Sequence, residues 1–240
     1  MSRSSTGIGT FERVEPDTAA TVTDHHRTGV VLAGGYSTRF GDADKALAEI
    51  DGTPMLARVV DRLSAVVDSL VVSCRADQEA AFDRAIAELD LDVPVRFALD
   101  PNPDSGPLAG IAHSFDGIES TYAAVVACDM PFVDPTFIEL LFEQVVGHDA
   151  AVPELDDGHR QPTQAVYHVD RTATVAGRRL AAEKLSLRGA LSELHTLTIP
   201  PATVSEHTTW RSLQDVNDRA AFDRLTGERN RPSDEPDGDC

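Results

Sequence analysis

Short apolar runs alternate with helical patterns along most of this chain, and this alternation constrains its fold more than any other feature. Six runs are typical of buried strands: residues 29–33, 70–74, 95–99, 123–127, 150–152 and 163–168. Between them, apolar side chains recur at helical spacing in residues 54–67, 78–89 and 135–146. Repeated strand–helix units favour parallel strands with helices on both faces. We therefore predict a single-domain α/β fold with a mostly parallel sheet.

The expected domain covers residues 28–226. Its first long helix places Leu56, Val59, Val60 and Leu63 on one face, and Pro54 suits a first helical position. Residues 1–27 are rich in Ser, Thr and charge and show no periodicity, so they are predicted to be a disordered extension. Residues 227–240 are predicted to be a disordered acidic tail.

The charge balance is strongly acidic. The chain has 40 acidic and 21 basic residues, for a net charge of −19, and 41% of its 240 residues are hydrophobic. Such a surface disfavours generic binding to nucleic acid or to an anionic membrane. Only Lys45 and Lys184 are lysines, and the acidic residues run along the whole chain. This balance is typical of adaptation to high salt, which screens self-repulsion, so we predict a halophilic source.

The cysteines indicate a reducing compartment. Cys74, Cys128 and Cys240 are odd in number, widely spaced and without a C-x-x-C pair, which predicts neither a disulfide framework nor a thiolate zinc site. No segment approaches the ~18 uninterrupted apolar residues of a membrane span. The N-terminus has no apolar core of the signal-peptide kind. We expect a cytoplasmic protein that does not bind membranes.

A glycine-rich loop follows the first predicted strand. Gly34 and Gly35 would let backbone N–H groups approach a phosphate without a Cβ in the way. Arg39 and Lys45 then add positive charge, Arg39 as a planar fork and Lys45 as a point charge. The spacing excludes both G-x-x-x-x-G-K-[ST] and G-x-G-x-x-G, which disfavours a dinucleotide oxidoreductase. The alternative is an ordinary glycine-rich turn.

Other polar residues follow the next strands. Ser73 lies near the end of the second run, and Asp100 and Asp129 follow the third and fourth. Ligands of open α/β sheets lie beyond the carboxyl ends of the strands, so we expect these residues at one edge with Gly34 and Gly35.

Asp129 is the candidate metal ligand. A carboxylate there can hold Mg²⁺, which prefers one or two carboxylates together with phosphate oxygens and waters. The alternative is a strand-end Asp that caps a turn before Pro131. Gly106 and Gly110 lie at the entrance of a helix predicted over residues 108–115, where they would leave room for a base or a phosphate. A simple helix start is again the alternative.

Three motifs together resemble a known family. LAGG-x-S-x-R-x-G-x-x-D-K at residues 32–45, GPLAG at 106–110 and CD-x-P at 128–131 resemble the molybdenum cofactor guanylyltransferases, the MobA family of the NTP-transferase superfamily. The resemblance covers roughly residues 28–226. It implies a Rossmann-like nucleotidyltransferase with Mg²⁺ as cofactor. It also implies transfer of GMP from GTP to molybdopterin cofactor, forming molybdopterin guanine dinucleotide and pyrophosphate.

The resemblance also implies roles for individual residues. The catalytic residues would be Arg39, Lys45 and Asp129, with Asp129 on the metal. Asp215-Val216-Asn217 resembles the family's late N-x-N motif, with Asp in place of the first Asn; alternatively, Asn217 caps a helix over residues 219–225. Nucleotide contacts are implied for Leu32, Ala33, Gly34, Gly35, Lys45, Ser73, Asp100, Gly106, Gly110, Asp129 and Asn217.

The acceptor side is less marked in the sequence. Arg178, Arg179 and Arg188 are candidates for the acceptor's phosphate, and His159 is a candidate for the rim of that site. Solvated or paired surface arginines are the ordinary alternative. Related activities stay open: cytidylyl transfer to the same cofactor, transfer to a sugar or cobinamide phosphate, or a non-catalytic nucleotide-binding regulator. Proteins that supply the cofactor, or molybdoenzymes that receive it, would be partners.

Overall fold

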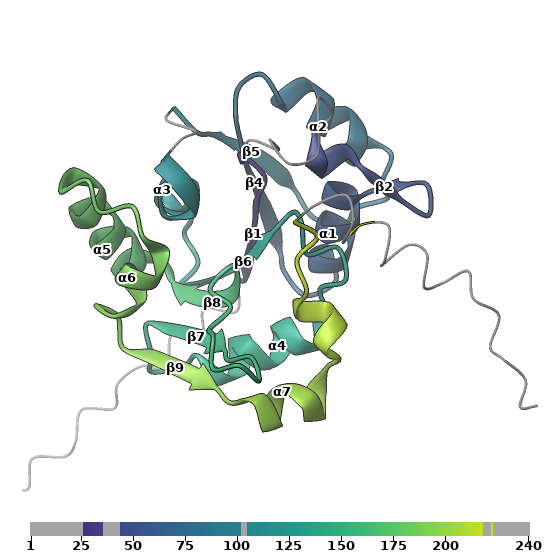
Figure 1. Ribbon diagram of the computed structural model, residues 1–240. Helices are drawn as coiled ribbons and strands as arrows, with labels where there is room; N and C mark the ends of the chain where they lie inside the picture. Colours follow the sequence, from purple (N-terminus) through teal and green to yellow (C-terminus); the bar gives the residue numbers. More distant parts are fainter. Residues whose placement is uncertain (1–25, 36–43, 102–104, 218–221, 223–240) are drawn as a thin grey trace, which may run out of the picture.

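A seven-stranded sheet with the order β5–β4–β1–β6–β8–β7–β9 forms the centre of the protein (Figure 1). The structure is a computed structural model that describes residues 26–35, 44–101, 105–217 and 222. Six of these strands are mutually parallel, and β8 runs antiparallel to both of its neighbours. The strands are β1 (Thr28–Leu32), β4 (Ser69–Cys74), β5 (Val95–Leu99), β6 (Tyr122–Ala127), β7 (Ala150–Pro153), β8 (Gln164–His168) and β9 (Thr196–Ile199).

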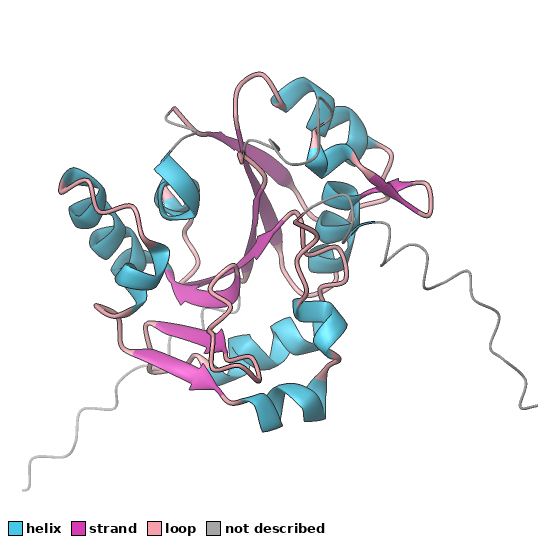
Figure 2. Ribbon diagram, viewed as in Figure 1, coloured by secondary structure: helices cyan, strands magenta, loops and turns pink. Residues whose placement is uncertain are grey.

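Helices cover both faces of the sheet (Figure 2). One face packs against α1 (Met55–Ser64), α2 (Glu79–Ala87), α4 (Pro135–Gln144) and α7 (Pro201–His207). The other packs against α3 (Gly106–Phe115), α5 (Val169–Ala181) and α6 (Leu187–Leu191). Val30 and Val31 are both fully buried and belong to opposite faces, because neighbouring side chains of a strand alternate. A strand buried on both sides is apolar throughout, which is the pattern that the sequence shows.

Smaller elements complete the described chain. β2 (Glu49–Ile50) and β3 (Thr53–Pro54) form a short antiparallel hairpin. Of the 3₁₀ helices in the described residues, η1 (Lys45–Leu47) begins at the motif residue Lys45, and η3 (Trp210–Leu213) ends just before Asp215. None of the described helices is long and apolar enough to cross a membrane.

The predicted α/β fold is confirmed, with corrections at particular elements. All six predicted strands are present, within one residue at each end. The prediction for Pro54 was wrong: it ends β3 and precedes α1 with an extended backbone (ψ 141°). The sequence prediction also missed β9, whose four residues include only one that is fully buried, so that no apolar run marks it. The predicted extension 1–27, the closing helix 219–225 and the tail 227–240 lie outside the described residues, apart from residues 26, 27 and 222.

The carboxyl ends of the four adjacent parallel strands β5, β4, β1 and β6 meet at one edge, as predicted. Leu32 of β1 pairs in register with Ser73 of β4 and with Ala127 of β6. The ladder continues past the strand ends, since the Cys128 amide donates to the Leu32 carbonyl at 2.9 Å. The Asp100 amide likewise donates to the Cys74 carbonyl at 2.8 Å. The segments that follow β1, β5 and β6 therefore lie at the same carboxyl edge of the sheet.

Candidate active site

A pocket of about 200 Å³ lies beyond the carboxyl ends of the central strands. Seven of the predicted nucleotide-contact residues line it, although they come from four separate segments of the chain. Three further residues, Pro107, Ala127 and Thr163, complete the lining. The seven are Leu32, Gly34, Gly35, Ser73, Asp100, Gly106 and Gly110.

Gly110 allows α3 to lie close to the sheet at this pocket. A Cβ at this position would lie 3.2 Å from Ser73 Oγ and 3.4 Å from Leu32 Cδ2, which is tighter than ordinary contact. Gly106 begins α3 with a φ of +75°, a conformation that L side chains rarely adopt. The first turn of α3, at Gly106 and Pro107, therefore opens onto the pocket. A helix N-terminus presents backbone N–H groups and positive potential, both of which suit an anionic ligand.

A polar cluster of Lys45, Asp129 and Asn217 lies at the same edge. Lys45 Nζ donates to Asp129 Oδ2 at 2.8 Å and lies 3.4 Å from Asn217 Oδ1. Both charged side chains are largely sheltered, with exposed fractions of 13% for Lys45 and 21% for Asp129. The structure therefore brings together three predicted residues from distant parts of the chain.

Backbone contacts fix this cluster. The Val216 amide donates to the Asp129 carbonyl at 2.8 Å, which places the segment 215–217 against the loop after β6. Asn217 Nδ2 also donates to Asp215 Oδ2 at 2.6 Å. Asp215, which replaces the first Asn of the family motif, thus orients the side-chain amide of Asn217. Asn217 is turned toward Lys45 by this bond.

Lys45 is placed by a local cap. Asp44 precedes η1, and its Oδ1 accepts a hydrogen bond from the Ala46 amide at 3.0 Å. Ala46 is buried, so the 3₁₀ turn is anchored in the core beside Lys45. Asp residues favour this position because their short side chain reaches the unpaired N–H groups of the first turn.

The two described cysteines are unsuited to nucleophilic chemistry. Burial raises the pKa of the Cys74 thiol to about 12, with the nearby Glu79 carboxylate adding to the effect. Burial, followed by the negative charge of Asp129, also raises the pKa of the Cys128 thiol. Both thiols therefore stay protonated at neutral pH, and the thiolate is the reactive form.

Some predicted residues lie elsewhere. Arg39 lies outside the described residues. Ala33 is buried and does not line the pocket; its carbonyl instead accepts a hydrogen bond from Gln78. Arg178 and Arg179, candidates for the acceptor phosphate, both donate to Glu193.

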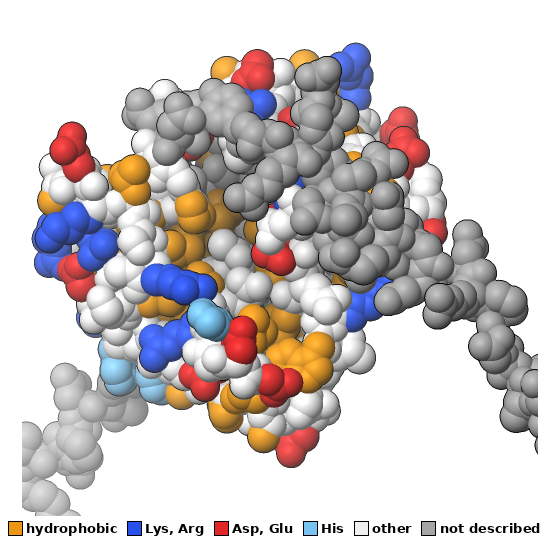
Figure 3. Space-filling model, viewed as in Figure 1, with side chains coloured by type: hydrophobic (Ala, Val, Ile, Leu, Met, Phe, Trp, Pro, Cys, Tyr) orange, Lys and Arg blue, Asp and Glu red, His pale blue; other side chains and the backbone are white. Residues whose placement is uncertain are grey.

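The remaining acceptor-side candidates lie on the surface. Arg188 is exposed on α6, and His159 forms an exposed pair with Asp157 at 3.0 Å. Basic side chains gather over α5 in the view of Figure 3, on the flank of the molecule beside α6. The sequence prediction missed two residues of the site, Thr163 and Gln78. No motif marks either of them as a site residue, and only the fold brings them there.

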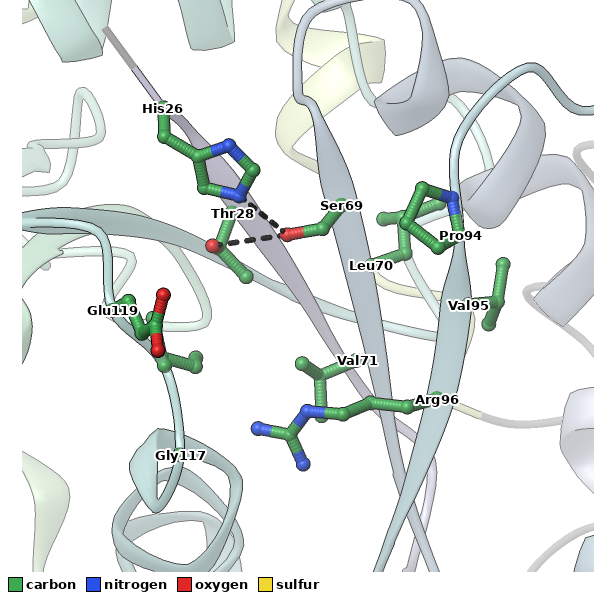
Figure 4. Close-up of a pocket in the computed structure, with 11 residues that line it drawn as sticks. His26, Thr28, Ser69, Leu70, Val71, Pro94, Val95, Arg96, Gly117 and Glu119 are labelled. Carbon is green, nitrogen blue, oxygen red and sulfur yellow. Dashed lines mark hydrogen bonds between the residues drawn. The ribbon is translucent and has the colours of Figure 1, made fainter. Parts of the chain in front are cut away.

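Another pocket, of about 220 Å³, lies at the opposite edge of the sheet, at the amino ends of β1 and β4. Figure 4 shows Ser69 Oγ within hydrogen-bond distance of both Thr28 Oγ1 and His26 Nε2, each at 3.2 Å. Arg96 and Glu119 reach the same space from β5 and from the segment after α3. None of the predicted site residues lines this pocket, so it is separate from the candidate active site.

The pocket and the motifs agree with a family match. A family model described as "MobA-like NTP transferase domain" matches residues 29–197. The chain belongs to this family. It is therefore a nucleotidyltransferase. The motifs at residues 32–45, 106–110 and 128–131 lie inside the matched region, and residues 215–217 lie beyond its end.

Curated relatives extend the match over most of the chain. A probable molybdenum cofactor guanylyltransferase from Natronomonas pharaonis is 44% identical over 80% of this chain and 92% of its own length. A relative of the same name from Haloferax mediterranei is 35% identical over 81% of this chain and 90% of its own length. Both sources fit the predicted halophilic origin.

A solved structure supports the fold of the family. The molybdopterin-guanine dinucleotide biosynthesis protein A from Archaeoglobus fulgidus aligns with a TM-score of 0.69 at 22% identity. The alignment covers 84% of this chain and 98% of that protein. At this level of identity the comparison bears on the fold alone, and it confirms the predicted nucleotidyltransferase architecture.

Proposed function

We propose that this enzyme transfers GMP from GTP to molybdopterin cofactor, giving molybdopterin guanine dinucleotide and pyrophosphate. The observation that carries the proposal is the Lys45–Asp129 pair at 2.8 Å, set at the same strand edge as a glycine-lined pocket. The names of the curated relatives support the choice of guanylyl group and acceptor. Contacts with proteins that supply the cofactor or receive the product belong to the same proposal.

The glycine-lined pocket would hold the nucleotide. Gly34 and Gly35 present backbone without a Cβ, so phosphates can approach the main chain closely. Asp100 supplies a carboxylate in the same pocket, where it would accept hydrogen bonds from the ribose or from the guanine base. The N-terminus of α3 faces the same space. These features would hold the donor nucleotide in the pocket with its phosphates directed toward Lys45.

A divalent cation fits the oxygen-rich end of this site. Asp129 and Asp215 supply carboxylates, and Mg²⁺ prefers one or two of these with phosphate oxygens and waters. Among the described residues there is no group of three or more His, Cys, Asp or Glu side chains that could hold a metal unaided. That composition suits a cation held jointly by protein and triphosphate. When bound, Mg²⁺ would neutralise phosphate charge at the reacting centre.

The side chains of this enzyme would then act by charge and position. Attack of the acceptor's terminal phosphate on the α-phosphorus of GTP releases pyrophosphate. A phosphate monoester is largely ionised at neutral pH, so the attack needs no strong protein base. Lys45, with Arg39 from the same loop, would stabilise the charge that grows on the leaving pyrophosphate. Asn217 holds the Lys45 ammonium group near Asp129 before the donor binds.

The test is a reaction with each nucleoside triphosphate in turn. The enzyme is incubated with molybdopterin cofactor, Mg²⁺ and GTP, ATP, CTP or UTP, and the product is identified by its mass. We expect the guanine dinucleotide with GTP and no comparable product with the others. Formation of the cytosine dinucleotide would move the assignment to cytidylyl transfer. Absence of product with every nucleotide would favour the non-catalytic regulator.

A further inference from the structure

Two side chains of the β4–α2 connection bind three consecutive carbonyls of the glycine turn. Gln78 Nε2 donates to the Ala33 carbonyl at 3.3 Å. Arg75 Nη1 donates to the carbonyls of Gly34 and Gly35, at 3.2 and 3.1 Å. These bonds fix the orientation of successive peptide planes where β1 ends.

Fixing the carbonyls also fixes the amides. In a trans peptide the N–H points away from the C=O of the same unit. The N–H groups of Gly34 and Gly35 therefore point away from Gln78 and Arg75, and both glycines line the pocket. Successive N–H groups that face one side form a binding place for anions. Without these bonds, glycines would sample many other backbone conformations.

Gln78 also holds the far end of the same loop. Its Nε2 donates to Asp44 Oδ2 at 2.5 Å, while Asp44 Oδ1 caps the turn that begins at Lys45. Its Oε1 accepts from the Arg75 amide at 2.9 Å. Gln78 is only 3% exposed, so each of its polar atoms depends on these partners. One buried side chain thus links the start of the loop to the residue before Lys45.

We propose that Gln78 is a positioning residue that sets the glycine amides and Lys45 to bind the phosphates of the donor, with Arg75 as its support. This inference rests on the proposed function in one respect only, which is that the ligand is a nucleoside triphosphate. Gln78 does not touch the substrate and acts through Asp44, Lys45 and the glycine turn. A purely structural glutamine would affect folding without changing phosphate binding by the folded protein.

The decisive experiment exchanges the donor and the acceptor of the hydrogen bond between Gln78 and Asp44. Gln78→Glu sets a carboxylate against the Asp44 carboxylate, and Asp44→Asn sets an amide NH₂ against that of Gln78. Each single variant loses the link, by repulsion or by a clash of donors. The double variant Q78E/D44N restores one donor and one acceptor between the two side chains, keeps the acceptor for the Ala46 amide, and has the net charge of the wild type. It leaves the Ala33 carbonyl without its donor, since a carboxylate only accepts. Gln144→Glu, on the exposed face of α4, is the control for an added charge.

Affinity for inorganic tripolyphosphate with Mg²⁺, measured by calorimetry, is the first readout because it needs neither guanine nor acceptor. We expect about 10- to 100-fold weaker binding in each single variant, the size of effect that is typical when a side chain supporting a metal ligand is lost. Partial recovery relative to Gln78→Glu is expected in Q78E/D44N, because the link to residue 44 is restored and the bond to the Ala33 carbonyl is not. No comparable loss is expected in Gln144→Glu. Amide exchange at Ala46 should rise in Gln78→Glu and fall again in the double variant.

Two results would overturn the proposal. One is wild-type tripolyphosphate affinity in Gln78→Glu despite a lower Tm, which would make Gln78 structural only. The other is a double variant whose affinity is no better than that of Gln78→Glu, the single variant that lacks both bonds of the Gln78 amide. Failure of the wild type to transfer any nucleotide would count against the proposed function instead. The tripolyphosphate and exchange measurements still decide the role of Gln78 in that case.

Discussion

Lys45 Nζ lies 2.8 Å from Asp129 Oδ2, although 84 positions separate the two residues in the chain. The contact joins the end of the glycine-rich loop to the segment after β6, at the carboxyl edge of the mostly parallel sheet. In a protein with a net charge of −19, this sheltered cation is set where an anionic substrate would need it. The consequences can be tested residue by residue.

Asp129→Asn should lower the turnover of GTP by ~10²-fold or more if Asp129 has the proposed metal-binding role, because a neutral amide cannot replace an anionic ligand. The side chain keeps its size, so the fold and the Tm should change little. Steady-state rates over a range of Mg²⁺ concentrations measure the effect. Near-normal turnover at saturating Mg²⁺ would show that Asp129 is a turn residue.

Lys45→Ala should lower kcat more than it raises KM for GTP, since charge on the leaving pyrophosphate grows in the transition state. Arg39→Ala should behave in the same way. If both side chains serve one pyrophosphate, the double variant will lose less than the product of the two single losses. All three are compared at one salt concentration. An unchanged kcat with only a raised KM would mean that the loop binds without catalysing.

Tyr167→Phe should lower the free energy of unfolding by about 1–2 kcal/mol, because it removes a buried donor and leaves its acceptor unpaired. Tyr167 is fully buried, and its hydroxyl donates to the Pro162 carbonyl at 2.6 Å. Tyr122→Phe is the matched control, since its hydroxyl bond to the His148 carbonyl is longer, at 3.4 Å. Urea unfolding compares the two. An equal loss in both variants would contradict the argument.

Glu193→Gln should reduce stability in a way that depends on pH. Hydrogen bonds from Arg179 and then Arg178 lower the pKa of the Glu193 carboxyl in the folded protein. The carboxylate therefore stabilises the fold above its ordinary pKa, and this contribution is lost as the pH falls through the folded pKa. The Tm difference from wild type should be present at neutral pH and disappear in acid.

The control for this change is Glu143→Gln on α4, which has no ion pair within the part of the chain that the structure describes. Its Tm should follow that of the wild type at every pH. A Glu193→Gln deficit that persisted in acid would assign the loss to packing around Gly189, against which the Arg179 side chain lies.

Added salt should raise the Tm of the wild-type protein. Excess negative charge repels itself in the folded state, and the Debye length falls from about 10 Å at ~0.1 M salt to about 3 Å at ~1 M. Thermal scans in KCl measure the change. A Tm that fell steadily over this range would contradict the interpretation of the composition as an adaptation to high salt.

Local patterns of the sequence determined the fold class and the edge at which the site lies. Apolar runs such as residues 123–127 mark buried strands by themselves, and parallel strands necessarily share a carboxyl edge. Gly34, Ser73 and Asp100 could therefore be grouped before the structure was known, and all three line one pocket. Local sequence patterns were sufficient here because each of these residues lies within a few positions of the end of a predicted strand.

Only the tertiary structure decided which of these groups touch. Asn217 reaches Lys45 because a backbone bond fixes its segment against Asp129, and Arg178 and Arg179 meet Glu193 because α5 packs beside α6. Gln78 carries no motif, yet it binds both ends of the glycine loop. Such contacts depend on the register and packing of segments far apart in the chain. A hydrogen bond needs its donor and acceptor within about 3 Å, and no local pattern specifies that distance.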